Sequence, residues 1–121
     1  MSARATFHLT PAAWWTEADP SAPLGAPSLA TEGFIHCTTG AAEMVATANR
    51  HYRDDARDFV VLTVDLDRLT SPWRVEDPGG IYPHVFGPID RAAILDLRPM
   101  PRDADGLFRA FDAEEDGVDR R

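Results

Sequence analysis

The chain has 121 residues, of which 44% are hydrophobic, with one cysteine and a formal net charge of -8 at pH 7. This length supports one hydrophobic core, so a single domain is predicted. A negative chain without lysine disfavours a broad nucleic-acid-binding surface, and one cysteine excludes a disulfide framework or a multi-cysteine zinc site. No run of about 18 apolar residues occurs, so we expect a cytoplasmic protein that does not enter the membrane.

The N-terminal part of the chain is predicted to form a strand, a short helix and a loop. Apolar and polar residues alternate over residues 5–9, which predicts a strand with His8 on the face opposite the apolar pair. Pro11 is tolerated in the first turn of a helix, which we expect to continue to about Ala18. Residues 19–30 are rich in proline and small polar residues and are expected to form an irregular loop.

A second predicted strand, residues 34–37, leads into the clearest helix, residues 41–52, whose apolar residues fall at helical spacing. Because this helix directly follows Thr38 and Thr39, its free amide groups are expected to point toward the His36 end of the strand. Such amides favour an anionic group. Alternatively, the threonines only cap the helix.

The second half of the chain is predicted to consist mostly of strands. Residues 59–66 are apolar on one face and partly polar on the other, which indicates a central strand. Shorter extended segments are expected at residues 73–76, 85–86 and 92–97. This order predicts an α+β domain over residues 1–101. Residues 102–121 are expected to be a C-terminal tail, partly docked or disordered.

Three histidines, His8, His36 and His84, lie in strand-like segments flanked by aromatic residues, and we expect them to meet around one pocket. They form no His-x-His or His-x-x-x-His pair, so no metal site is expected. His51 is expected to face solvent near the end of its helix. Cys37 follows His36 on a strand, so the two point to opposite faces and Cys37 is expected to be a small buried residue.

Arg74 and Glu76 lie two residues apart on a predicted strand and therefore share one face. They form either a surface ion pair that contributes little, or an anion clamp and a carboxylate beside the histidines. The spacing alone favours the ion pair.

Four separated segments together resemble the domain-of-unknown-function 952 family. The segments are Phe7-His8-Leu9, Glu32-Gly33-Phe34-Ile35-His36-Cys37-Thr38-Thr39, Trp73-Arg74-Val75-Glu76 and Tyr82-Pro83-His84-Val85-Phe86-Gly87-Pro88-Ile89. The similarity covers residues 6–100 in chain order and leaves the tail uncovered. It implies a fold but no established activity.

The fold that this resemblance implies is ADP-ribosyltransferase-like, with two small split sheets that clasp NAD as the substrate. By that analogy, His8 binds the ribose or the carboxamide, and His36 with Thr38 lines the nicotinamide end. Active transferases also use a late glutamate to stabilise positive charge on the reacting ribose. Here the late motif carries His84, and Glu76 precedes it. The expected catalytic residues are His36, Glu76 and His84. The expected ligand-binding residues are His8, Thr38, Thr39, Arg74 and Tyr82.

Three functions therefore remain open. The first is an ADP-ribosyl-transfer or glycohydrolase-like enzyme that uses NAD or a related nucleotide. The second is a domain that binds a nucleotide or another small molecule without catalysis. The third is an enzyme in which histidines act as acid and base on a small anionic substrate. All three place a small-molecule ligand among the histidines. Either Glu76 reaches into this site, or His84 has a different role there, or the pocket binds a ligand without catalysis.

Overall fold

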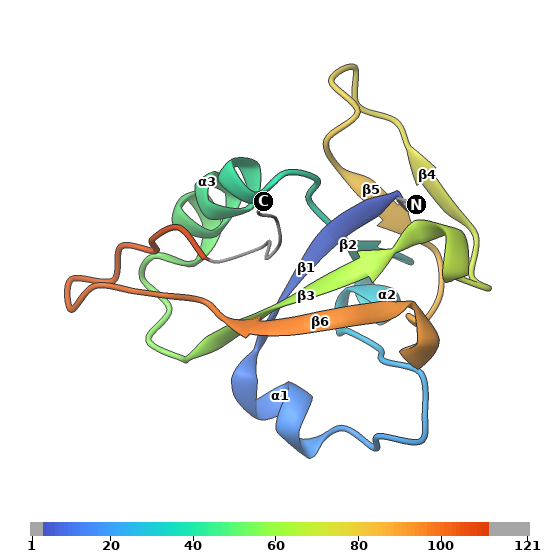
Figure 1. Cartoon of the computed structure of the whole chain (residues 1–121), viewed down its shortest axis with the longest axis horizontal. Helices are drawn as coiled ribbons and strands as arrows, with labels where there is room; N and C mark the ends of the chain where they lie inside the picture. Colours follow the sequence, from blue (N-terminus) through green and yellow to red (C-terminus); the bar gives the residue numbers. More distant parts are fainter. Residues whose placement is uncertain (1–3, 112–121) are drawn as a thin grey trace, which may run out of the picture.

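The computed structural model describes residues 4–111 and is built on β3 (Phe59–Asp65), the central strand of a three-stranded sheet. Both faces of β3 are largely buried, as its apolar sequence predicts. β1 (Ala5–Pro11) and β6 (Ile94–Pro99) pair with it on either side, both antiparallel. Figure 1 shows the three strands side by side across the centre of the molecule.

A second antiparallel sheet is made of three short strands in the order β2-β5-β4. These strands are β2 (Ile35–His36), β5 (Pro83–Val85) and β4 (Trp73–Val75). Within it, Ile35 pairs with Val85, and both side chains are fully buried. Neighbouring residues of a strand point to opposite faces, so the residues next to Ile35 and Val85 lie on the other face of this sheet.

The core has two parts, one on each face of the first sheet. On one face, Leu62 and Val64 of β3 pack against Ile35 and Val85 of the second sheet. On the other face, buried residues of β3 pack against α3 (Ala41–Tyr52) and the C-terminal segment. The domain therefore has three layers, with the first sheet in the middle.

Most predicted elements are confirmed, and the predicted bounds of the helix over residues 41–52 agree with those of α3. The first helix, α1, spans Ala12–Glu17. The irregular loop predicted at residues 19–30 is shorter than expected, because its last residues belong to a short helix, α2 (Ser28–Thr31). Two 3-10 turns, Leu66–Arg68 and Arg91–Ala93, precede a linker and β6 respectively. The fold is thus a mixed α and β domain with two antiparallel sheets and few helices.

The chain beyond residue 101 packs on the domain as far as Phe111. Phe108 and Phe111 are buried in the core beside α3. The guanidinium of Arg102 donates to the carbonyls of Tyr52 and Arg57, at 2.9 and 2.8 Å, and so fixes the turn after α3. The part of the predicted tail at residues 112–121 lies outside the described residues.

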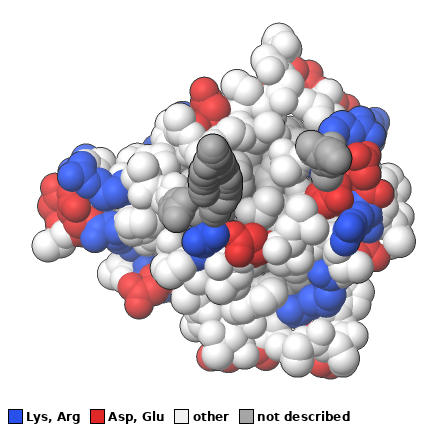
Figure 2. Space-filling model, viewed as in Figure 1, with Lys and Arg blue, Asp and Glu red and all other residues white. Residues whose placement is uncertain are grey.

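Charges of both signs are mixed on the surface. On the face in Figure 2, arginine side chains lie beside aspartate and glutamate side chains, and no wide basic area is seen there. Within residues 4–111, no helix has the length and apolar composition needed to cross a membrane.

Replacing Gly106 with alanine should destabilise the domain more than the same change at Gly33. Both glycines have a positive φ, 94° and 88°, so each substitution strains the backbone by about 1–2 kcal/mol. A Cβ at Gly106 would also lie 2.6 Å from the Arg53 carbonyl oxygen, whereas a Cβ at Gly33 meets nothing within 4 Å. We expect an additional loss of about 1–3 kcal/mol for Gly106→Ala, measured by urea unfolding. Equal losses would contradict this packing.

Candidate functional site

A cleft of about 730 Å³ lies where β1 separates from β2. Phe7 and Thr38 form the only backbone bridge between these segments in the described part of the chain, with N–H···O distances of 2.9 and 2.8 Å. In an antiparallel ladder the next pair joined by backbone hydrogen bonds would be Leu9 and His36. The strands do not pair there, and the gap between them opens into the cleft.

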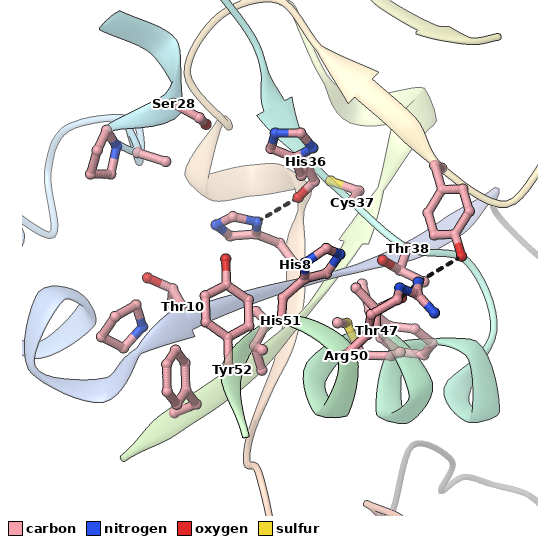
Figure 3. Close-up of a pocket in the computed structure, with 18 of the residues that line it drawn as sticks. His8, Thr10, Ser28, His36, Cys37, Thr38, Thr47, Arg50, His51 and Tyr52 are labelled. Carbon is pink, nitrogen blue, oxygen red and sulfur yellow. Dashed lines mark hydrogen bonds between the residues drawn. The ribbon is translucent and has the colours of Figure 1, made fainter. Parts of the chain in front are cut away.

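The side chain of His8 spans this gap. Its Nδ1 lies 2.9 Å from the carbonyl oxygen of His36, and this hydrogen bond is the dashed line beside His36 in Figure 3. Because a carbonyl oxygen only accepts hydrogen bonds, Nδ1 carries the proton and donates. In the neutral ring, Nε2 is then a hydrogen-bond acceptor, and the ring lines the cleft.

Burial keeps His8 neutral. Its residue is only 7% exposed, and this desolvation lowers the pKa of the imidazole, opposed in part by the bond to His36. A neutral imidazole with a free acceptor nitrogen can accept a proton or a hydrogen bond from a ligand hydroxyl.

His36 occupies the wall opposite α3 and carries a carboxylate partner. Its Nε2 lies 3.0 Å from a carboxylate oxygen of Glu32, and both side chains are about half exposed. His84 is the cross-strand neighbour of His36, with ring centroids 5.6 Å apart, and it stacks on Phe34 at 4.1 Å. His36 and His84 therefore form one continuous polar wall of the cleft.

The opposite wall is the C-terminal half of α3. Thr47, Arg50, His51 and Tyr52 all line the cleft, and Arg50 donates to the hydroxyl of Tyr82 at 3.2 Å. His51 is exposed near the end of α3, as expected, and it also lines the cleft.

The start of α3 does not contribute as predicted. Gly40 is the N-cap, and no side chain caps the helix. Neither Thr38 nor Thr39 therefore has the expected capping role, and of residues 41–44 only Met44, at the end of the first turn, lines the cleft. The helix amides are consequently not part of this site.

Five predicted site residues come together, and three do not. The cleft is lined by His8, His36, Thr38, Tyr82 and His84. Arg74 and Glu76 lie elsewhere, because β4 is the far edge of the second sheet, and they form an exposed ion pair at 3.7 Å. Thr39 donates its hydroxyl proton to Thr6 and lines a separate, smaller pocket.

Sequence reasoning missed several lining residues, above all Glu32 and Arg50. Glu32 precedes His36 by four residues, and the short turn between them brings the two side chains together. Arg50 lies on the polar face of the predicted helix, and helical spacing alone does not say which polar residues face a ligand. Trp14 from α1 also lines the cleft, at its outer end.

Cys37 is buried, and burial raises the pKa of its thiol to about 12. It therefore remains a neutral thiol and cannot serve as a thiolate nucleophile at neutral pH. Among residues 4–111, no three or more histidine, cysteine or acidic side chains are grouped so as to hold a metal ion.

Comparison with known proteins places this fold in a family without an assigned function. Residues 9–97 match DUF952, described as a protein family of unknown function. The crystal structure of protein CC0527 from Caulobacter crescentus is similar, with 23% identity and a TM-score of 0.70 over 87% of this chain and 93% of that chain. Its solution NMR structure gives 24% identity and a TM-score of 0.66, over 85% and 90%. No curated protein matches. At this identity the similarity to CC0527 shows the fold alone.

The stability of the protein should fall as the pH drops below about 6.5, the ordinary imidazole pKa. The unfolded chain then binds a proton at His8 that the folded chain resists, so unfolding is favoured by up to about 1.4 kcal/mol per pH unit. His8→Phe should flatten this slope in urea unfolding between pH 7.5 and 5. Asp55, whose pKa is lowered to about 2 by hydrogen bonds from Arg57, loses its contribution only in stronger acid, below about pH 4. Equal slopes in the two proteins would contradict a buried neutral His8.

Cys37 should react with a thiol reagent only when the protein unfolds. The native thiol is buried and protonated, so its labelling rate at pH 8 should be at least about 100-fold below that of the urea-unfolded chain. The measurement is absorbance after addition of an aromatic disulfide reagent. Rapid labelling of the folded protein would restore Cys37 as a candidate nucleophile.

Proposed function

The chain belongs to the DUF952 family, and on that premise we propose that its cleft binds a nucleotide of the NAD type and promotes ADP-ribosyl transfer or glycohydrolysis. The observation that carries this proposal is His8, a buried imidazole that lines the cleft, is held by the His36 carbonyl, and has no second hydrogen-bond partner among residues 4–111. Its Nε2 is suited to accept a hydrogen bond from a ribose hydroxyl.

The size and walls of the cleft support a nucleotide ligand. Ligand sites usually enclose about 300–1,000 Å³, and this cleft has about 730 Å³. Trp14, Tyr52 and Tyr82 supply aromatic surface on which a base or a nicotinamide ring can stack. Arg50, at the end of α3, supplies a guanidinium that can meet a phosphate.

The fold supports the same proposal. Two small antiparallel sheets are joined by one backbone bridge within residues 4–111 and part beside it. We propose, from the resemblance in the sequence, that they hold a ligand in this opening as an ADP-ribosyltransferase-like domain would. The lone free thiol of Cys37 fits a reducing compartment, so we propose that the protein acts in the cytoplasm.

Glu32, and not Glu76, is the carboxylate that we assign to the reaction. Loss of nicotinamide leaves positive charge on the ribose, and a fixed carboxylate stabilises that charge. Glu32 lines the cleft and is hydrogen-bonded to His36, whereas Glu76 lies outside it. His36 then orients Glu32, and His84 supports His36 from the neighbouring strand.

His8 also favours a second candidate function. A neutral imidazole whose pKa is lowered and whose acceptor nitrogen faces a cleft can act as a general base. With Arg50 as the group that binds the anion, the cleft would then serve proton transfer on a small anionic substrate. The two candidates differ in whether nicotinamide is released from NAD.

Saturating NAD or ADP-ribose should raise the melting temperature of the protein. At a ligand concentration of about 100 times Kd, binding adds about 2.7 kcal/mol to the free energy of unfolding. His8→Phe keeps a ring but removes the acceptor, so Kd should rise at least about 10-fold. Thermal shift and calorimetry provide the measurements. No response to NAD, ADP-ribose or nicotinamide would reject the nucleotide proposal.

Glu32→Gln should lower kcat for nicotinamide release from NAD by about 100-fold, because the charge-stabilising carboxylate is lost. Glu43→Gln is the matched control and should retain kcat, since Glu43 is exposed and lies outside the cleft. Glu76→Gln tests the other carboxylate and should also retain kcat at saturating NAD, since Glu76 does not line the cleft. Chromatographic assay of nicotinamide checks all three variants. If NAD binds but no nicotinamide appears with any acceptor tried, the domain binds without catalysis. If only Glu76→Gln loses activity, the assignment of Glu32 is wrong.

A further inference from the structure

The outer face of the second sheet carries a row of nitrogen-bearing side chains that leads out of the cleft. His36 pairs with His84 on one side of β5, and Arg74 pairs with His84 on the other. Residues in register on neighbouring antiparallel strands point to the same face, so the three side chains form one row. His36 and His84 line the cleft, and Arg74 continues the row beyond it.

Aromatic rings hold this row in place. Phe34 stacks on His84 with an interplanar angle of 16°, and its centroid lies 5.5 Å from that of Phe86. The guanidinium of Arg74 lies over the ring of Phe86, 4.7 Å from its centroid. The imidazole and the guanidinium are therefore positioned by stacking, which leaves their N–H groups at the edges for other partners.

Arg74 is only loosely paired. Its ion pair with Glu76 spans 3.7 Å, and the two side chains are 64% and 59% exposed. By contrast, Arg57 at the other end of the cleft is held by Asp55 at 2.6 Å. Within the described residues, the ring nitrogens of His84 have no hydrogen-bond partner, although the ring itself is half-buried. Among residues 4–111, the guanidinium of Arg74 is thus weakly paired and the ring nitrogens of His84 are unpaired.

We propose that Arg74 and His84 form a phosphate subsite at the edge of the cleft, which receives the phosphates of a ligand whose other end lies beside His8. The inference deepens the proposed function and rests on it for the identity of that ligand. A guanidinium fork and an imidazole N–H are both donors that suit phosphate oxygens. Strands in a sheet are about 4.8 Å apart, so Arg74 is within reach of a diphosphate that passes His84.

Glu76 has a defined part in this subsite. In the absence of a phosphate, its carboxylate pairs with Arg74 across the exposed edge of the sheet. A bound phosphate replaces Glu76 as the partner of the Arg74 guanidinium. Glu76 then opposes binding, because its carboxylate and the phosphate are both negative. Glu32 pairs with His36 at the opposite end of the row, so it lies farther from Arg74 than Glu76 does. The subsite is therefore centred on His84 and Arg74.

Pyrophosphate is the probe, because it needs no nucleoside and so tests the subsite apart from the cleft. Its Kd is measured by calorimetry at pH 6.5, and contact is followed by the imidazole NMR signals of His84. Arg74→Ala should raise this Kd at least about 10-fold, as expected for loss of a charge-assisted hydrogen bond. Arg109→Ala is the matched control, since Arg109 is similarly exposed and paired with Asp103. It should leave Kd unchanged.

Glu76→Gln gives the test with the opposite sign. Removing the carboxylate frees Arg74, so pyrophosphate should bind about 2- to 5-fold more tightly. Equal effects of Arg74→Ala and Arg109→Ala, or weaker binding after Glu76→Gln, would overturn the subsite. So would a His84 signal that pyrophosphate does not move.

Failure of the subsite and failure of the proposed function give different results. If ADP-ribose binds in a His8-dependent way but Arg74→Ala has no effect on either ADP-ribose or pyrophosphate, the subsite is wrong and the cleft proposal stands. If pyrophosphate binds in an Arg74-dependent way and neither NAD nor ADP-ribose binds more tightly than pyrophosphate, the subsite stands and the nucleotide proposal is wrong.

Discussion

One backbone bridge, between Phe7 and Thr38, determines where this protein can hold a ligand. It joins the two sheets by two backbone hydrogen bonds. Beyond it the strands part, and the hydrogen bond from His8 to the His36 carbonyl takes the place of the missing backbone pair. Burying that polar bond costs little, because the donor and the acceptor satisfy each other. The cleft therefore results from the way in which the two sheets join.

The electrostatics of the cleft differ from those of the chain as a whole. The protein carries a formal charge of -8, yet all four histidines and two arginines line this one cleft. No lysine is present, so every fixed cation is a planar guanidinium that can stack on a ring and still bind an anion through its edge. Glu32 and Asp77 also line the cleft, so an anionic ligand would meet donors and carboxylates together inside an acidic molecule.

The two glutamates illustrate how position decides chemistry. Glu32 and Glu76 are the same acid, and both pair with a nitrogen group of the same side-chain row. Glu32 pairs at the end that opens into the cleft, where charge on a bound ribose could be stabilised. Glu76 pairs at the far edge strand, where it competes for a guanidinium. Glu32 would thus promote a reaction, whereas Glu76 would weaken the binding of phosphate.

The sequence by itself determined the strands, the helix over residues 41–52 and the family, because these depend on local periodicity and on motifs that are read in order. It also predicted that His8, His36 and His84 meet, since each ends or lies within a strand. Only the tertiary structure decided which polar neighbours join them. Strand order places Glu76 two strands beyond β2, and the packing of α3 brings Arg50 to the cleft. Both depend on contacts between residues far apart in the chain, which local spacing does not encode.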